Sequence, residues 1–260
     1  MAALSFEKLA PKKMISERAV PKAVRDAILH IFENCKEGAW LVGGTALAGY
    51  YAEHRRSDDI DLFTTGEASH KAVILAVRSL QRLGALFSNE MQTPQFFRTD
   101  VSWQDHKFTI DVVLDENIHR IGQALRSKDN VLVADIKTLF AMKAACMVSR
   151  VSEKDLFDLD WIFVNAGEPS MQEMVALGSQ IDGGLNVQTM LISLKGALLR
   201  KEACHFLLPD SNMTPAEAFN RIGAFRKKLI HSLLEYERSL PLSSDASKLS
   251  KAVRFAKRFK

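Results

Sequence analysis

Cysteine is scarce in the 260-residue sequence, which contains only Cys35, Cys146 and Cys204. These residues lie far apart, and neither a Cys-x-x-Cys pair nor a histidine cluster accompanies them. The sequence therefore predicts neither a disulfide framework nor a zinc site. Because unpaired cysteines are typical of proteins in a reducing compartment, we expect a cytoplasmic protein.

Long hydrophobic runs are also missing. No stretch of eighteen consecutive apolar residues occurs, and the opening MAALSFEKLAPKK lacks the apolar core of a signal peptide. We therefore expect no membrane association. With 47% hydrophobic and 25% charged residues, the composition is that of an ordinary globular protein with one large domain or two smaller ones.

An excess of positive charge is absent from most of the chain and concentrated at its end. Residues 221–260 contain eleven Lys or Arg against three acids, a net charge of +8, which leaves −4 for the first 220 residues. Within them, the pattern of Lys248–Lys260 predicts an amphipathic helix with cations on one side. Clustered cations bind polyanions, so this segment is either an RNA-binding surface or a solvated terminal helix.

Hydrophobic periodicity predicts an α/β or α+β fold with a mixed sheet in the first half of the chain. The expected elements are a helix over 20–34, a strand over Ala39–Val42, a helix over Thr45–Ala52, a strand over Asp59–Phe63, a helix over Lys71–Leu83, and strands around Gln95–Arg98 and Phe108–Leu114.

After residue 134 the pattern is helical. Asp135 is a suitable N-cap for a helix over Ile136–Val148. Thr214-Pro215-Ala216-Glu217 combines a capping box with proline at the first helical position, so a helix is expected from there towards Arg238. We therefore expect a sheet-containing module over residues 1–134 and a helical module over residues 135–260.

Two aspartates, Asp59 and Asp61, alternate with Ile60 and Leu62 in a strand pattern. Successive side chains on a strand point to opposite faces, so both carboxylates share one face. Like charges held this close repel each other, and a divalent cation with a preference for oxygen ligands, such as Mg²⁺, relieves the repulsion. A bare Asp-x-Asp also fits a hydrated acidic junction, so the neighbouring residues must decide.

The turn Gly43-Gly44-Thr45 lies between a predicted strand and a predicted helix. The first amides of a helix lack intrahelical partners and attract anions, and glycine lets the backbone approach a phosphate closely. Thr45 adds a hydroxyl. Alone the turn is an ordinary tight turn, but together with an acid pair it can hold a nucleoside triphosphate and its magnesium.

Two further residues are candidates for the same site. Asp111 lies on the polar face of the strand pattern Phe108–Leu114, where it is either a third metal ligand that positions the attacking hydroxyl or an edge residue in a salt bridge. Lys143 interrupts an apolar helix face. Because an unpaired buried ammonium is costly, we expect it to meet an anion, either nucleotide phosphates or a protein carboxylate.

The segment Leu41–Phe63 closely resembles the AbiEii/AbiGii-type toxin nucleotidyltransferases of bacterial type IV toxin–antitoxin and phage-abortive systems, within the polymerase-β-like superfamily. The resemblance covers roughly residues 35–165. Each motif alone is weak evidence, but their occurrence together in the order typical of the family is specific. Three further family motifs are matched by Arg55 with Ser57, by Leu139–Lys143 and by Asp155–Asp158.

This resemblance implies a minimal nucleotidyltransferase core over residues 1–134, with the helical module completing the nucleotide site. It implies an NTP as co-substrate, Mg²⁺ or Mn²⁺ as cofactor, an acceptor hydroxyl such as that of tRNA or another RNA, and an antitoxin protein as partner. The implied catalytic residues are Asp59 and Asp61, as metal ligands, with Lys143 and Asp158. Asp111 matches the family more loosely, and its strand position makes it the expected third catalytic acid and metal ligand. The implied nucleotide-binding residues are Gly43, Gly44, Thr45, Arg55, Ser57 and Lys143.

Other functions fit parts of the pattern. A glycosyltransferase also uses Asp-x-Asp but leaves the glycine turn and Lys143 unexplained, and a haloacid-dehalogenase-type phosphatase needs an apolar strand before its acids. A nucleotide-sensing or RNA-binding module without catalysis remains an alternative, because a fold alone does not decide function. Transfer to a small molecule or to a protein is a further alternative.

Overall fold

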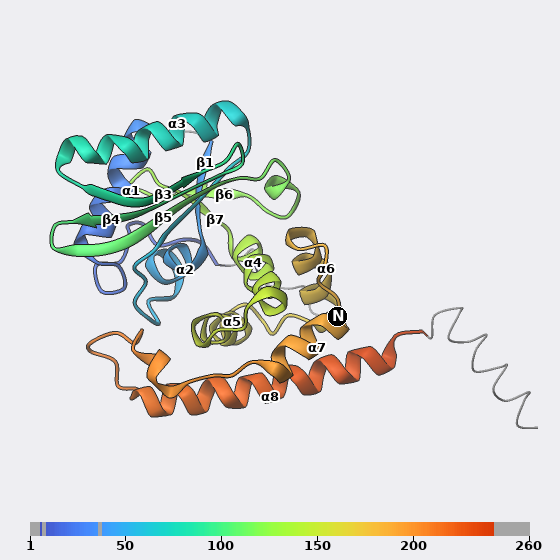
Figure 1. The fold of residues 1–260 in the computed structure, drawn as a ribbon. Helices are drawn as coiled ribbons and strands as arrows, with labels where there is room; N and C mark the ends of the chain where they lie inside the picture. The colour runs from blue at the N-terminus through green and yellow to red at the C-terminus, as the bar shows by residue number, and fades with distance from the viewer. Residues whose placement is uncertain (1–5, 7–8, 36–37, 242–260) are drawn as a thin grey trace, which may run out of the picture.

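The computed structural model describes residues 6, 9–35 and 38–241. They form a seven-stranded mixed sheet with helices on both sides, followed in sequence by a helical region (Figure 1). The basic segment Lys248–Lys260 lies outside the described residues. Within the described part, no helix combines the length and the apolar character needed to cross a membrane.

Strands and helices alternate over the first half of the chain, as expected for an α/β or α+β fold. In chain order the elements are α1 (Lys22–Asn34), β1 (Ala39–Val42), α2 (Gly43–Leu47), the π-helical η2 (Ala48–Ala52), β2 (Ile60–Thr64), α3 (Glu67–Arg78), the 3-10 helix η3 (Ser79–Leu83), β3 (Leu86–Gln92), β4 (Phe96–Trp103), β5 (His106–Leu114), the 3-10 helix η4 (Ile118–Arg120), β6 (Ala124–Arg126) and β7 (Leu132–Ala134).

The described residues after β7 are helical or irregular. Their elements are α4 (Ile136–Ser149), α5 (Glu153–Asn165), α6 (Met171–Ile181), α7 (Val187–Gly196), the 3-10 helix η5 (Lys201–Cys204) and α8 (Pro215–Ser239). Two expected helix starts are confirmed. The carboxylate of Asp135 caps α4 by accepting a hydrogen bond from the Thr138 amide at 2.8 Å, and Thr214 and Glu217 form the capping box of α8.

Strand β2 lies at the centre of the sheet, whose strand order is β3-β4-β5-β2-β1-β7-β6. It pairs antiparallel with β1 and parallel with β5. In this register Asp61 lies opposite Val42 on one side and opposite Asp111 on the other. The sheet therefore brings two of the candidate acids together from positions fifty residues apart in the sequence.

Different helices pack against the two faces of the sheet. On β4, Phe97, Thr99 and Val101 are buried, and α3 lies along this face, with the Arg78 guanidinium 5.3 Å from the centre of the Phe97 ring. Figure 1 shows α3 above the sheet and α2 below it. The alternate residues of β4 therefore point to the other face, on which the acids lie.

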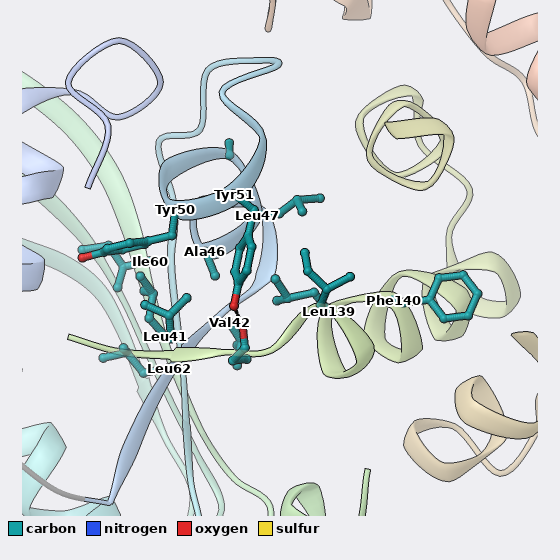
Figure 2. Close-up of a cluster of buried hydrophobic side chains, with 14 of the residues drawn as sticks. Leu41, Val42, Ala46, Leu47, Tyr50, Tyr51, Ile60, Leu62, Leu139 and Phe140 are labelled. Atoms are coloured by element: carbon teal, nitrogen blue, oxygen red, sulfur yellow. Dashed lines mark hydrogen bonds between the residues drawn. The ribbon is translucent and has the colours of Figure 1, made fainter. Parts of the chain in front are cut away.

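A continuous hydrophobic core joins the sheet to the helical region. Figure 2 shows side chains of β1, β2, α2 and η2 on one side of α4, with Leu139 turned towards them and Phe140 on the far side of the helix. The Tyr51 hydroxyl donates a hydrogen bond to the carbonyl of Ala134 at 2.9 Å, which ties η2 to the end of β7. The last described strand ends at Ala134, and the division into modules at this residue stays a prediction.

The sequence missed or misplaced several elements. Strand β3 was not expected because it is an edge strand whose side chains are almost all exposed, so it lacks the hydrophobic alternation that marks a strand. Strand β6 has only three residues and was also missed. The helix after β1 begins at Gly43 rather than Thr45, and α3 begins at Glu67 rather than Lys71.

Candidate active site

Three aspartates form a row on the polar face of the sheet, and we call Asp59, Asp61 and Asp111 the acid row. Asp59 directly precedes β2, and Asp61 and Asp111 are neighbours on β2 and β5. Alternation on β2 sends Ile60 and Leu62 into the core. The Thr109 hydroxyl donates to Oδ1 of Asp59 at 2.8 Å and fixes the direction of that carboxylate.

The acid row has little compensating charge. Burial, followed by the charges of Asp111 and Asp59, raises the pKa of Asp61 to about 6, although Lys143 acts in the opposite direction. Burial also raises the pKa of Asp111, against the effect of Arg98, whose guanidinium lies 3.2 Å from Oδ2. The other oxygen of Asp111, Oδ1, is buried without a hydrogen-bond partner. This arrangement would be stabilised by a cation.

Two glycines allow the turn after β1 to approach the acid row. Gly43 has φ +69°, and a Cβ atom there would lie 2.0 Å from Oδ2 of Asp61. A Cβ atom on Gly44 would lie 2.4 Å from Nη2 of Arg55. A larger residue at either position would displace the neighbouring charged side chain, and at Gly43 the positive φ also favours glycine.

Thr45 and Ser57 lie behind this turn. The Thr45 side chain is fully buried, its hydroxyl lies 3.0 Å from the Ser57 hydroxyl, and it donates to the main-chain carbonyl of Asp59. These contacts fix the segment before β2 against α2. Thr45 is therefore placed to hold Asp59 in position, whereas the sequence had suggested a hydroxyl for phosphate.

A buried group of charges, which we call the ion-pair network, lies next to the acid row. Asp158 accepts two hydrogen bonds from Arg55, Nε to Oδ1 at 2.6 Å and Nη2 to Oδ2 at 2.8 Å. Nζ of Lys143 lies 2.7 Å from Asp158 and 2.7 Å from Asp155. The imidazole of His54 completes the network, 2.8 Å from Oδ1 of Asp158 and stacked on a phenylalanine of α5.

The charges of the ion-pair network balance. Burial alone would raise the pKa of Asp158, but Arg55 and Lys143 hold it well below its usual value. Lys143 likewise overcomes burial and lowers the pKa of Asp155. Burial lowers the pKa of His54 despite Asp158, so the imidazole is neutral at pH 7. Two cations thus face two carboxylates, and Lys143 meets the protein anion that was one of its two expected partners.

A cleft of about 370 Å³ lies between the acid row and the junction where α4 ends and α5 begins. Its walls include Gly43, Gly44 and Lys143. Two further cations line it, Arg150 at the end of α4 and Lys154 at the start of α5, and both are exposed. Sequence analysis did not assign these two to the site, although Arg150 follows Lys143 on the same helix.

No group of three His, Cys, Asp or Glu side chains in the described part of the chain is placed to hold a metal ion by itself. Asp61 and Asp111 lie side by side, while Asp59 is turned towards Thr109. Oxygen ligands of this kind suit Mg²⁺, which usually binds one or two carboxylates and takes its other ligands from water and substrate phosphates. The donor set therefore fits a metal that arrives with a nucleotide.

Comparisons with known proteins found a matching family model and similar solved structures. Residues 29–223 match the family model described as nucleotidyl transferase AbiEii toxin, type IV TA system. Among solved structures, the chain is similar to MenT4, a nucleotidyltransferase toxin from Mycobacterium tuberculosis H37Rv, with a TM-score of 0.53 and 14% identity over 86% of this chain and 84% of that one. JHP933 from Helicobacter pylori has a TM-score of 0.45 and 16% identity, over 83% and 93% of the two chains. No curated protein sequence matches the chain. The expected mixed α/β fold is confirmed.

Proposed function

Because the chain belongs to the AbiEii nucleotidyltransferase toxin family of type IV toxin–antitoxin systems, we propose that it transfers a nucleotide from an NTP to an acceptor hydroxyl with Mg²⁺ or Mn²⁺. The observation that carries this proposal is the approach of the Gly43 turn to the Asp61 carboxylate. A glycine turn against an acid row, in a cleft lined by cations, can hold phosphates and a divalent ion together.

The residues that would hold the cation are Asp59 and Asp61, with Asp111 beside them. Asp61 has a raised pKa, and Asp111 has an oxygen without a partner, so both carboxylates gain from a positive charge. When bound, the ion neutralises phosphoryl oxygens and lowers the pKa of an attacking hydroxyl. Asp111 would contribute only Oδ1, because Arg98 already pairs with its other oxygen.

The nucleotide phosphates would lie at the Gly43-Gly44 turn. Arg150 and Lys154 are exposed on the opposite wall, where they can contact a triphosphate. Lys143 carries three N–H donors, and two carboxylates take two of them, which leaves one for a phosphate. Arg55 uses three of its five N–H donors on Asp158 and the Arg56 carbonyl, and its proposed role is to support Gly44 from behind.

The acceptor that we propose is RNA, with tRNA as the first candidate. The charge of +8 over residues 221–260 supports a polyanionic partner. Family membership supports an antitoxin protein as a second partner. An RNA acceptor and an antitoxin partner both fit a cytoplasmic location, which we propose as well. Transfer to a protein or small molecule, and nucleotide sensing without catalysis, are the alternatives, and the intact acid row favours catalysis over sensing.

Metal-dependent transfer of a labelled NTP to total tRNA tests this function. We expect Asp59→Ala and Asp61→Ala to abolish transfer at every Mg²⁺ concentration while the variants remain folded. Asp210→Ala, which removes an exposed acid paired with Arg18, is the control and should behave like the wild type. Full activity of either acid-row variant, with unchanged metal dependence, would refute the assignment.

A further inference from the structure

A second groove lies beside the nucleotide cleft and shares Asp59 with it. This groove, of about 480 Å³, lies on the polar face of β3, β4 and β5, and we call it the sheet groove. The polar residues that define it are Asp59, Ser88, Asp100, Ser102, Lys107 and Thr109. None of the functional assignments above uses it.

The strand register makes the sheet groove continuous with the acid row. Ile60 lies opposite Ile110, so the preceding residues Asp59 and Thr109 are neighbours, and their side chains are joined by the 2.8 Å hydrogen bond. Thr109 in turn lies opposite Asp100, and Lys107 lies opposite Ser102. A polar path therefore runs across three strands from the acid row towards the edge of the sheet.

The order of the strands separates the two sides of the site. The Gly43-Gly44 turn follows β1, on one side of β2, whereas the sheet groove lies on β5, β4 and β3, on the other side. In phosphoryl transfer the attacking and leaving oxygens lie roughly in line on opposite sides of the phosphorus. If the triphosphate lies at the turn, the attacking hydroxyl must come from the side of the sheet groove.

We propose that the sheet groove is the acceptor subsite and receives the hydroxyl-bearing 3′ end of an RNA chain, an inference that rests on the proposed nucleotidyl transfer. The acceptor oxygen forms a bond to the α-phosphorus, and the bond between that phosphorus and the bridging oxygen of the β-phosphate breaks. Pyrophosphate leaves with the electron pair, and the hydroxyl proton passes to water. Asp59, which lines both spaces, marks the point where the two substrates meet.

The lining of the sheet groove favours the end of a polynucleotide. Small-molecule sites are mostly apolar and enclose their ligand, whereas Ser88, Asn89 and Lys107 are exposed to solvent. Protein partners usually need buried aromatic or apolar anchors. Lys107 instead suits a phosphate, and Asp100, held by Asn89 at 2.6 Å, together with Ser102, suits ribose hydroxyls.

Charge reversal at Lys107 tests the acceptor subsite in the full chain. Lys107→Glu should raise the KM for tRNA by about tenfold or more, because it replaces one charge-assisted phosphate contact with repulsion. Its affinity for the Mg²⁺–NTP complex, measured by titration calorimetry, should stay within about twofold of the wild type. Lys71→Glu is the matched control: it makes the same charge change on α3, which covers the opposite face of the sheet.

A second variant changes the charge of a side chain in the sheet groove without changing its size. Asp100→Asn keeps the size of the side chain, and it should weaken the preference for an RNA acceptor over the same chain ending in 2′-deoxyribose. If Lys107→Glu and Lys71→Glu use tRNA equally well, the sheet groove is not the acceptor subsite. If the wild type labels a protein instead of RNA, the RNA assignment is wrong. If the wild type binds no Mg²⁺–NTP and labels no acceptor, the proposed transfer itself fails.

Discussion

The acid row and the ion-pair network are neighbours, but their charges are arranged in opposite ways. In the acid row, carboxylates face each other with Arg98 as a direct cationic partner of Asp111. In the ion-pair network, Arg55 and Lys143 are matched by two buried aspartates at hydrogen-bond distances. The pKa of Asp61 is accordingly raised, and that of Asp158 is lowered.

This difference suggests different roles for the aspartates of the two groups. Carboxylates that destabilise each other are suited to bind something that brings positive charge, and we therefore propose that the acid row takes part in the reaction. Carboxylates that are already neutralised inside the protein hold the surrounding elements in place. We expect Asp158 to act in this second way rather than in the reaction, because it joins α5 to Arg55 in the segment before β2 and to Lys143 of α4.

Removal of Asp158 is the most damaging change that this comparison predicts. Asp158→Ala leaves Arg55 and Lys143 buried with a single remaining carboxylate, Asp155, and breaking a buried pair in this way costs about 3–5 kcal/mol of the free energy of unfolding. Urea denaturation followed by circular dichroism measures the loss. We expect any loss of activity in this variant to follow from the loss of folded protein.

A surface pair provides the control for Asp158. Asp210→Ala breaks the ion pair with Arg18, in which both side chains are more than half exposed, and should change stability by about 0–1 kcal/mol. If Asp158→Ala is as stable as Asp210→Ala and yet inactive, Asp158 acts in the reaction, and the distinction between the two groups of charges is wrong.

Lys143 belongs to the ion-pair network and lines the nucleotide cleft, so a double-mutant cycle is needed to separate its roles. Lys143→Met should destabilise the protein strongly because it leaves Asp155 unpaired except for Ser152. Adding Asp155→Asn restores the charge balance, and we expect a coupling of about 0.5–3 kcal/mol. NTP affinity should stay low in the double variant and near normal in Asp155→Asn alone. Normal NTP binding by the double variant would leave Lys143 with a structural role only.

The sequence predicts the parts of this site that depend on local rules. Alternation places Asp59 and Asp61 on one face, and a suitable side chain at Asp135 caps α4, because both effects act over a few residues. The mixed sheet follows from the same periodicity. Lys143 could be expected to meet an anion, but its partners could not be chosen, because a phosphate and a carboxylate satisfy a buried ammonium equally well.

The parts that the sequence missed depend on contacts between distant segments. Arg98 is paired with Asp111 only because β4 and β5 are antiparallel neighbours in one register. The edge strand β3 carries exposed side chains and shows no hydrophobic alternation, so the sheet groove that it borders was not foreseen. Lys154 is an exposed lysine at the start of a helix, and only the packing of α5 beside the cleft distinguishes it from other surface cations.

Gly43→Ala is expected to destabilise the protein less than Asp158→Ala does, and to reduce its activity clearly. A side chain at φ +69° is strained, which costs about 1–3 kcal/mol, and the new Cβ must also push the Asp61 carboxylate aside. Gly84→Ala is a matched control, because Gly84 has φ +91° but open space around its Cβ position. We expect both variants to lose stability in denaturant and only Gly43→Ala to lose metal-dependent transfer. Equal transfer by the two variants would show that the turn need not approach the acid row.

The comparison also predicts a pH dependence of opposite sign in the two groups of charges. The pKa of Asp61 is raised from 3.8 to about 6, so folding favours its protonated form, and the stability that it contributes is lost as the pH rises through 6. Asp158 has a lowered pKa, and its contribution is lost only in acid, below the usual range of an aspartate.

In metal-free protein, the free energy of unfolding should therefore decline between about pH 4 and pH 6, and Asp61→Asn should reduce that slope. Urea titrations in EDTA at pH 4.5, 5.5 and 6.5 measure it. An unchanged slope in Asp61→Asn would mean that Asp61 has a cationic partner in solution, and the acid row would then lack the uncompensated charge that makes it a place for a metal.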